Sequence, residues 1–331
     1  MTSIKDVAKL AQVSVATVSR VINNTENVQD ETKERVLAAI KELNYSPNLL
    51  GRSLRRLETK KILVMLNTIS NQFYSRVVKG IEEKAIPHGY TVMVCMTHGN
   101  CKIEQRYMQM LKTRLVDGAV FLTTEQDGNT LTNELSAVNV VQACEPREDF
   151  LTSTVSIDNE KAAYDSVSYL IKKGHKKIAF FGAGDIYQSS IKREHGYCKA
   201  LKENNIPVNP NWIFNEGFSF NAGIRASSLL LSKGELPTAI FCISDSCAAG
   251  AMKALAQNDI KIPDDISIMG FDNTQLSQIY MPSITTLKQP QYEIGYQAME
   301  LLLNKINGTD TNINHLLLDY EIVERESVKQ I

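Results

Sequence analysis

Apolar side chains recur every three or four residues in three short runs near the start of the chain, a spacing typical of helices that bury one face. Ser3 and Ser14 precede the first two runs and can cap the helices that begin there. Two helices joined by a tight turn and followed by a third predict a helix-turn-helix domain over residues 1–46. The three helices are expected at residues 3–11, 14–22 and 30–43.

From Lys61 onward the pattern changes to short, continuous apolar runs that alternate with amphipathic stretches. Strands that are apolar on both faces and alternate with helices are typical of parallel sheets covered by helices on both sides. The run KKIAFFGAGD restarts this pattern in mid-chain, so the sequence predicts an α/β body of two doubly wound parallel lobes. The expected strands contain ILVMLN, YTVMVCM, GAVFLT, VNVVQA, KIAFFG, TAIFCI and DISIMGF.

The second short helix has a surface suited to duplex DNA. When Val18 and Val21 face the other two helices, the opposite face carries small and polar residues followed by an arginine. Small side chains allow close approach to a major groove, hydroxyls can bond phosphates or base edges, and arginine can pair with guanine through two parallel bonds. An ordinary amphipathic helix in a small domain is the alternative interpretation. The candidate DNA contacts on this helix are Ser14, Val15, Ala16, Thr17, Ser19, Arg20 and Asn23.

The next segment, residues 47–60, predicts a hinge. Its core NLLGRSLRR combines leucines with arginines in a stretch too short to be helical by itself in water. We therefore expect a hinge helix that forms on DNA. There Leu54 would unstack a base step in the minor groove, while Arg52 and Arg55 hold phosphates. A plain charged linker is the alternative, and it would not explain the leucines.

Charge and composition narrow the functional classes. The chain has 331 residues and a formal net charge of −1, but residues 1–61 hold 11 Lys and Arg against 7 Asp and Glu. A mildly basic head before an acidic body suits an anionic partner at one end. Neither a membrane span nor a signal peptide is recognisable, so we expect a cytoplasmic protein without membrane contact. The six cysteines lack metal-binding or redox spacing, and we expect them reduced, with no metal and no cofactor.

Motifs along the whole chain resemble the LacI/GalR family of bacterial transcriptional regulators. IKDVAKLAQVSVATVSRVIN, AAIKELNYSPN and GRSLRR are similar to its DNA-binding head and hinge, and PTAIFCISDSCAAGAMKAL, IPDDISIMGFDN and ITTLKQPQYEIG to its body. The resemblance implies a regulator, by default a repressor, that binds double-stranded palindromic operator DNA as a homodimer. It implies that Val15 and Ala16 select the operator sequence, that Arg20 contacts guanine and that Leu54 wedges the central step. Gly51 stands where the family commonly has alanine, and it weakens the expected hinge helix.

The resemblance also implies how the body is organised. The family's body is similar to periplasmic sugar-binding proteins, in which the chain returns to the first lobe near its end. We therefore expect the return near Gln289–Gly295. The expected first lobe comprises residues 61–159 plus 291–323, and the expected second lobe residues 160–290.

Ligands of such sheets lie beyond the carboxyl ends of the strands. The residues that follow the expected strands include carboxylates, one arginine and aromatic rings, which suit a small polyhydroxylated effector, a sugar or a nucleoside. By resemblance to the family, Arg193 and Asp272 occupy the positions most often used on the ligand, and Phe73, followed by Phe218, is the expected stacking residue. The candidate effector contacts are Phe73, Tyr74, Asp158, Arg193, Phe218, Asp245 and Asp272.

Purely structural roles are the alternative for several of these residues. Asp158 and Asp245 can each cap the helix that follows them. Phe73 and Tyr74 can belong to the core, and Asp272 can form a plain Asx turn.

An enzyme is not expected, because GxSxG, P-loop, HExxH and strand-following GxGxxG motifs are missing from the sequence. Two other functions stay open: a cytoplasmic ligand-binding protein, and a regulator controlled by a protein co-effector. The C-terminal segment LLDYEIVERESVKQI is too short after its last strand for a tetramerising coil, so a dimer is expected rather than a tetramer.

Overall fold

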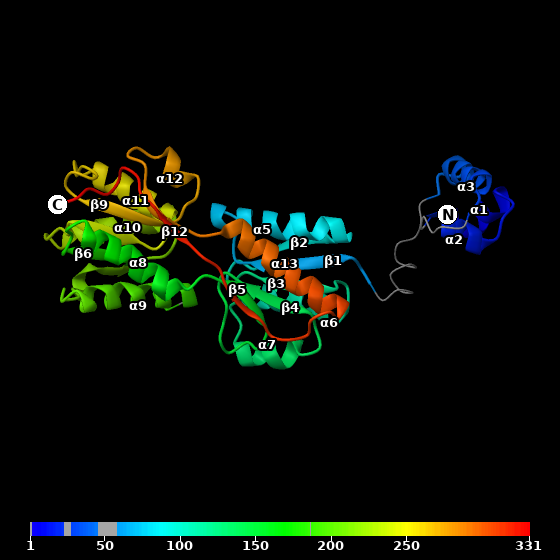
Figure 1. The fold of residues 1–331 in the computed structure, drawn as a ribbon, viewed down its shortest axis with the longest axis horizontal. Helices are drawn as coiled ribbons and strands as arrows, with labels where there is room; N and C mark the ends of the chain where they lie inside the picture. The colour runs from blue at the N-terminus through cyan, green and yellow to red at the C-terminus, as the bar shows by residue number, and fades with distance from the viewer. Residues whose placement is uncertain (1, 23–27, 46–57, 186) are drawn as a thin grey trace. The chain divides into compact units, whose positions relative to one another are not determined.

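The computed structural model describes residues 2–22, 28–45, 58–185 and 187–331, which form two compact units divided after Glu58 (Figure 1). Most of the predicted hinge lies outside the described residues, as do the predicted DNA contacts Asn23, Arg52, Leu54 and Arg55. None of the helices in the described ranges is long and apolar enough to cross a membrane.

The first unit is a bundle of three helices, α1 (Ile4–Leu10), α2 (Val15–Ile22) and α3 (Asp30–Glu42). Ser14 caps α2 as predicted, because the backbone N–H of Thr17 donates to its Oγ at 3.0 Å. One fully buried valine from each helix meets the others in the small core. These valines are Val7, Val18 and Val36. The predicted helix-turn-helix head is thereby confirmed.

The first lobe of the second unit is a six-stranded parallel sheet in the order β11-β5-β4-β3-β1-β2. Helices α5 and α13 cover one face and α6 and α7 the other. Alternate residues of β1 show this, since Ile62 and Val64 pack in the cluster that includes α5 and α13, whereas Leu63 and Met65 pack with α6 and α7. The strands are β1 (Lys61–Leu66), β2 (Thr91–Met96), β3 (Gly118–Phe121), β4 (Val140–Ala143), β5 (Ser153–Ser156) and β11 (His315–Leu317). The helices are α5 (Gln72–Ala85), α6 (Cys101–Lys112), α7 (Gly128–Leu135) and α13 (Gln291–Asn307).

The second lobe repeats this architecture, with a sheet in the order β12-β10-β9-β8-β6-β7. Helices α8 and α9 pack together on one side of it and α10 and α11 on the other, as Figure 1 shows. The strands are β6 (Ile178–Gly182), β7 (Ile213–Asn215), β8 (Ala239–Cys242), β9 (Ser267–Asp272), β10 (Thr285–Lys288) and β12 (Glu321–Val323). The helices are α8 (Asn159–Lys172), α9 (Gln188–Glu203), α10 (Phe220–Ser232), α11 (Asp245–Ala256) and the short α12 (Leu276–Ile279). The predicted fold class, a helix-turn-helix head and two doubly wound α/β lobes, is confirmed.

Three segments carry the chain between the lobes: those between β5 and α8, between β10 and α13, and between β11 and β12. The last of them corrects one predicted boundary. Residues 321–323, expected in the first lobe, form β12 and pair antiparallel with β10 of the second lobe. The tail stays with that lobe, since Ile268 donates its backbone N–H to the carbonyl of Ser327 at 2.8 Å.

Candidate functional site

A cavity of about 560 Å³ lies between the two lobes, at the carboxyl ends of several strands. The first lobe contributes the segment after β1, the first turn of α5 and the residues after β4. The second lobe contributes the start of α9, the segment before α10 and the end of β9. Five of the predicted effector residues line it: Phe73, Tyr74, Arg193, Phe218 and Asp272.

Arg193 is held rigidly in the cavity wall. The side chain is only 4% exposed. Its Nε donates to Asn159 Oδ1 at 2.9 Å, and its Nη1 donates to the carbonyl oxygen of Ile243 at 2.7 Å. The guanidinium also lies 3.7 Å from the centre of the Phe271 ring. Burial lowers the pKa of Arg193, while nearby carboxylates oppose this. A planar donor fixed in this way can bond two neighbouring acceptors of a ligand.

Asp272 ends β9 and faces the same cavity. Its Oδ1 accepts a hydrogen bond from Gln289 Nε2 at 2.7 Å. Burial raises the pKa of this carboxyl to about 8, against the opposing effect of Arg193. Its backbone φ is +108°, in the left-handed region, and its carbonyl oxygen accepts from Gln291 Nε2. The side chain is therefore oriented by the segment that leads back to the first lobe.

Aromatic rings line the cavity from both lobes. Asn71 caps α5 by accepting from the backbone N–H of Phe73 at 3.0 Å, which places Phe73 and Tyr74 in the first turn of this helix. Their rings meet edge to face with centroids 5.3 Å apart. In the second lobe Tyr187 and Phe218 make a similar contact at 5.6 Å. Rings on opposite walls suit a ligand with an apolar or planar face.

Asp158 and Asp245 do not line this cavity. Asp158 is the N-cap of α8, where it accepts from the backbone N–H of Lys161 at 2.9 Å. Asp245 is fully buried, and its carboxylate accepts from Thr274 N at 2.6 Å and from Thr286 Oγ1 at 2.6 Å. It stabilises the turn after β9, and its own helix is capped by Ser244. The interpretation as a helix cap therefore fits Asp158 but not Asp245, which has a different structural role, and neither side chain lies in the wall of this cavity.

Several residues of the cavity wall were not predicted. Glu145 is the second residue after the apolar run VNVVQA, behind Cys144, and Gln289 comes directly after β10, so both obey the rule that ligands meet strand ends. Applying that rule to every expected strand would have found Glu145. The other unpredicted residues are Asn67, Thr68, Ser70, Asn71, Cys144, Tyr187, Ser219, Phe220, Ser246, Leu276 and Tyr280.

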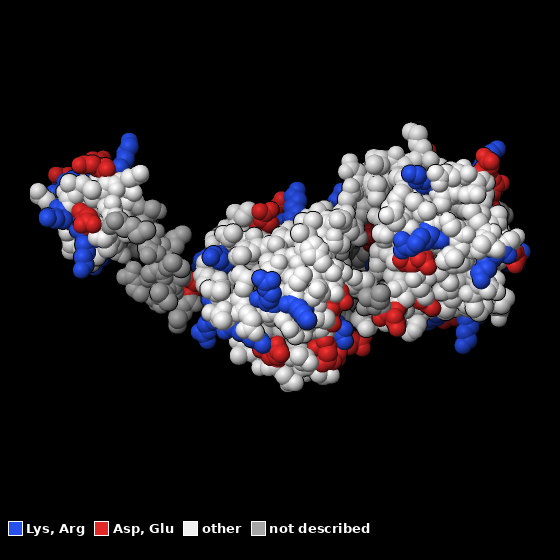
Figure 2. Space-filling model, turned by 180° about the vertical axis from the view of Figure 1, so that it is seen from behind, with Lys and Arg blue, Asp and Glu red and all other residues white. Residues whose placement is uncertain are grey.

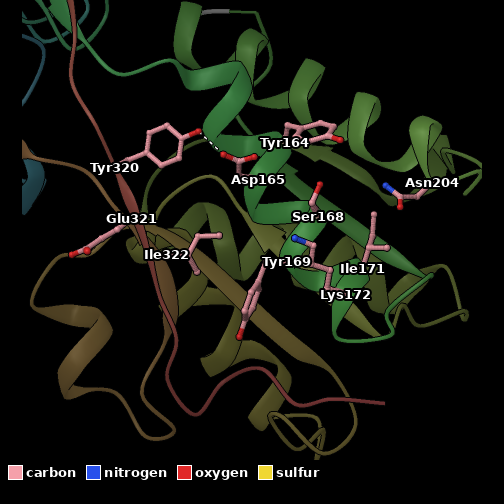
Figure 3. A pocket seen from close by; sticks show the side chains of 10 residues that line it. All are labelled: Tyr164, Asp165, Ser168, Tyr169, Ile171, Lys172, Asn204, Tyr320, Glu321 and Ile322. Atoms are coloured by element: carbon pink, nitrogen blue, oxygen red, sulfur yellow. Dashed lines mark hydrogen bonds between the residues drawn. The ribbon is translucent and has the colours of Figure 1, made fainter.

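A separate cavity of about 520 Å³ lies outside the cleft, between α8 and β12 (Figure 3). Tyr320 points from the segment before β12 toward Asp165 of α8, and its hydroxyl donates to the carboxylate at 2.7 Å. Lys161 also contacts Asp165, at 2.6 Å. None of the predicted site residues lines this cavity. The contacts beside this cavity attach the last crossover segment to the second lobe.

In the head, α2 presents the predicted DNA face. Val18 and Val21 are buried, while Val15 is 41% exposed and Ala16 and Arg20 are exposed. Ser14 is exposed, Thr17 and Ser19 are half-buried, and the Thr17 hydroxyl lies 2.9 Å from that of Ser14. The exposed side of α2 therefore begins with small side chains, which permits close contact with a groove.

Charge on the lobes is mixed. On the face shown in Figure 2, Lys and Arg alternate with Asp and Glu, and among the described residues of the lobes no broad patch of one sign is visible there.

The chain matches known protein families over both units. The family model "Bacterial regulatory proteins, lacI family" matches residues 3–48, and "Periplasmic binding proteins and sugar binding domain of LacI family" matches residues 59–326. A relative named HTH-type transcriptional regulator RegA, from Clostridium acetobutylicum, is 40% identical over 99% of both chains.

Solved structures agree with these matches. The lac repressor dimer bound to operator and the anti-inducer ONPF superposes with a TM-score of 0.90 at 27% identity, covering 99% of both chains. The complex of the transcriptional regulator CelR with cellobiose superposes with a TM-score of 0.76 at 26% identity, covering 99% of this chain and 100% of CelR.

Proposed function

Because the chain belongs to the LacI family of transcriptional regulators, we propose that it is a repressor that binds a palindromic operator as a dimer and is controlled by a small polyhydroxylated effector. The family consists of regulators of transcription, not of enzymes. A repressor of this kind acts on the chromosome, in the cytoplasm.

The observation that carries the proposal is the exposed face of α2. Val15 and Ala16 lie at the start of the helix on its exposed side, and Arg20 follows one turn later. The buried Val18 and Val21 fix which side faces outward. Small side chains followed by an arginine fit a major groove, where arginine recognises guanine and methyl groups contact thymine.

The effector is proposed to occupy the cavity between the lobes. Arg193 and Asp272 lie on one wall and can together bond neighbouring hydroxyl groups, since one donates and the other accepts. Phe73 and Phe218 offer apolar faces from opposite lobes. A sugar or a nucleoside combines hydroxyls with such a face. A complex of the similar regulator CelR with cellobiose supports the sugar alternative.

Dimerisation is proposed because one head buries little surface on DNA and a two-fold operator needs two heads. Exposed apolar side chains on both lobes support a self-association surface. Met281, just after α12, is 93% exposed, and Ile279 within α12 is also exposed. Val94 and Met96 are exposed on the edge strand β2 of the first lobe. In Figure 1 α12 and α5, which packs beside β2, lie along the same side of the lobes.

Selection from random duplex DNA by the purified full-length chain tests the proposal. We expect enrichment of a palindrome, and binding of that palindrome should change when the cognate sugar or nucleoside is added. Equal retention of all sequences would contradict a role as operator-binding repressor. A palindrome whose binding responds to no sugar or nucleoside would instead favour control by a protein co-effector.

A further inference from the structure

Helix α9 begins without a cap of its own. Its N-cap residue, Tyr187, forms no side-chain bond to the first turn. Instead, Glu145 reaches it from the other lobe, where it follows β4. The backbone N–H of Ser189 donates to Glu145 Oε2 at 3.0 Å, and the Ser189 hydroxyl donates to Oε1 at 2.5 Å. A carboxylate at a helix N-terminus both accepts free N–H groups and meets the positive end of the helix dipole.

Two more contacts join the first two turns of α9 to the first lobe. Asn67, directly after β1, donates its Nδ2 to the Tyr187 hydroxyl at 2.7 Å. Lys192 lies 2.9 Å from Glu148, but the Glu148 side chain is 80% exposed, so solvent weakens this pair. Glu145 is half-buried, and desolvation raises its pKa while its bonds from Ser189 oppose that rise. Glu145 is therefore the strongest of the three contacts between these turns and the first lobe.

The same helix carries the principal cation of the cleft. Arg193 lies four residues after Ser189, one turn further along α9, and both are buried. Glu145, Tyr187 and Asn67 also line the cavity. The position of Arg193 relative to the first-lobe wall is thus determined through α9, and the cap from Glu145 fixes the start of α9 against that wall.

We propose that Glu145 is a positioning residue of the effector site: by capping α9 from the opposite lobe, it favours the closed cleft and holds Arg193 at the distance a ligand needs. The inference rests on the proposed effector site. It predicts that loss of the cap opens the cleft even without ligand. The backbone N–H and the hydroxyl of Ser189 would then bond to water instead of to a carboxylate of the other lobe.

Distances between spin labels in the full-length chain test the cap directly. One label is attached to the exposed Cys101 of α6 and the other to Lys233→Cys after α10, with the half-exposed Cys198 replaced by serine. Glu145→Ala should lengthen or broaden the distance distribution between the lobes. Glu145→Gln keeps one acceptor oxygen, so it should restore the distribution in part. Glu148→Ala removes only the solvent-weakened pair with Lys192, so it should change the distribution far less than Glu145→Ala does.

A double-mutant cycle with Ser189→Ala separates the cap from a general loss of structure. If the cap acts as proposed, Ser189→Ala opens the cleft in the parent chain but has no further effect in Glu145→Ala. An unchanged distance distribution in Glu145→Ala, or strictly additive effects of the two substitutions, would overturn the proposal.

Ligand binding supplies a second readout. Ribose, cellobiose, adenosine and cytidine are titrated against the full chain by calorimetry. For any of them that binds, Glu145→Ala should weaken affinity about fivefold, the size expected for loss of one helix cap, and Glu148→Ala should not. Binding of none of them would count against the proposed effector class, whereas the distance measurements decide on the cap in either case.

Discussion

Arg193 is the residue on which the proposed effector response depends most, because the protein already holds its guanidinium through Asn159 and Ile243. Arg193→Lys should reduce effector affinity by about 10- to 100-fold, since charge-assisted hydrogen bonds contribute about 1.5–3 kcal/mol and lysine lacks the planar fork. Calorimetry with the effector found by thermal-shift screening measures the loss. Lys199→Ala on an exposed turn of the same helix is the control. Equal affinity of Arg193→Lys and the parent would remove Arg193 from the site.

The buried Asp272 makes stability depend on pH. Its pKa is raised to about 8, so the folded chain binds a proton more tightly than the unfolded chain does. Its contribution to stability is present below the ordinary aspartate pKa near 4 and is lost as pH rises through about 8. Asp272→Asn should therefore gain stability relative to the parent as pH rises from 4 to 8, measured by urea unfolding. A constant difference across this range would contradict the assignment.

At the residue scale the sequence predicted the location of the effector cavity better than it predicted which residues line it. Arg193, Asp272 and Phe73 were predicted from strand ends and from the family resemblance, and they line the cleft. Asp245 also follows a strand, but its side chain turns inward to bond two threonines. A position after a strand does not by itself tell whether a side chain points into the cavity or into the protein interior. Glu145 was not predicted because the loop that contains it leads to another strand, so no helix-capping pattern marks its position.

Pairs of helices in the lobes come into close backbone contact at glycine residues. A Cβ on Gly295 of α13 would overlap the carbonyl oxygen of Val77 in α5. Gly295→Ala should therefore force the two helices apart and cost about 3 kcal/mol, at the upper end of the usual range for overpacked cores. Chemical denaturation of the full chain measures the effect. Gly308→Ala is a matched control, because φ is +68° there and nothing lies near its Cβ, so about 1 kcal/mol is expected. Similar losses for both variants would argue against close packing as the cause.

Strands were predictable where they form long, continuous apolar runs. The continuous apolar runs became β1, β2, β3, β4, β6, β8 and β9 of the two sheets. The strands that were not among the expected ones are short, and several lie at sheet edges with exposed or polar residues, such as β7, β11 and β12. Three residues of mixed polarity carry too little periodicity to identify a strand, so pairing across the sheet decides these elements.

On the scale of the whole molecule, binding of DNA and of effector should be separable. A chain that begins at Lys61 retains every described strand of both lobes but none of α1–α3. It should lose operator binding completely and bind the effector within about twofold of the full chain, since the described residues that line the cavity all lie in the retained part. Fluorescence anisotropy with labelled operator and calorimetry measure the two affinities. Loss of effector binding in the shortened chain would contradict the prediction that the second unit binds the effector by itself.

Operator affinity of the full chain should also fall steeply as salt concentration rises.

The three crossovers also determine when each lobe can be completed on the ribosome. The first sheet receives its edge strand β11 and its covering helix α13 only after residues 159–288 have been made, and those residues build most of the other lobe. The second sheet is complete only after β12, which starts at Glu321, has been synthesised. Translation must therefore pass residue 315 before the first sheet can acquire its last strand and residue 321 before the second can, and a premature stop shortly before residue 315 would leave both halves incomplete at once.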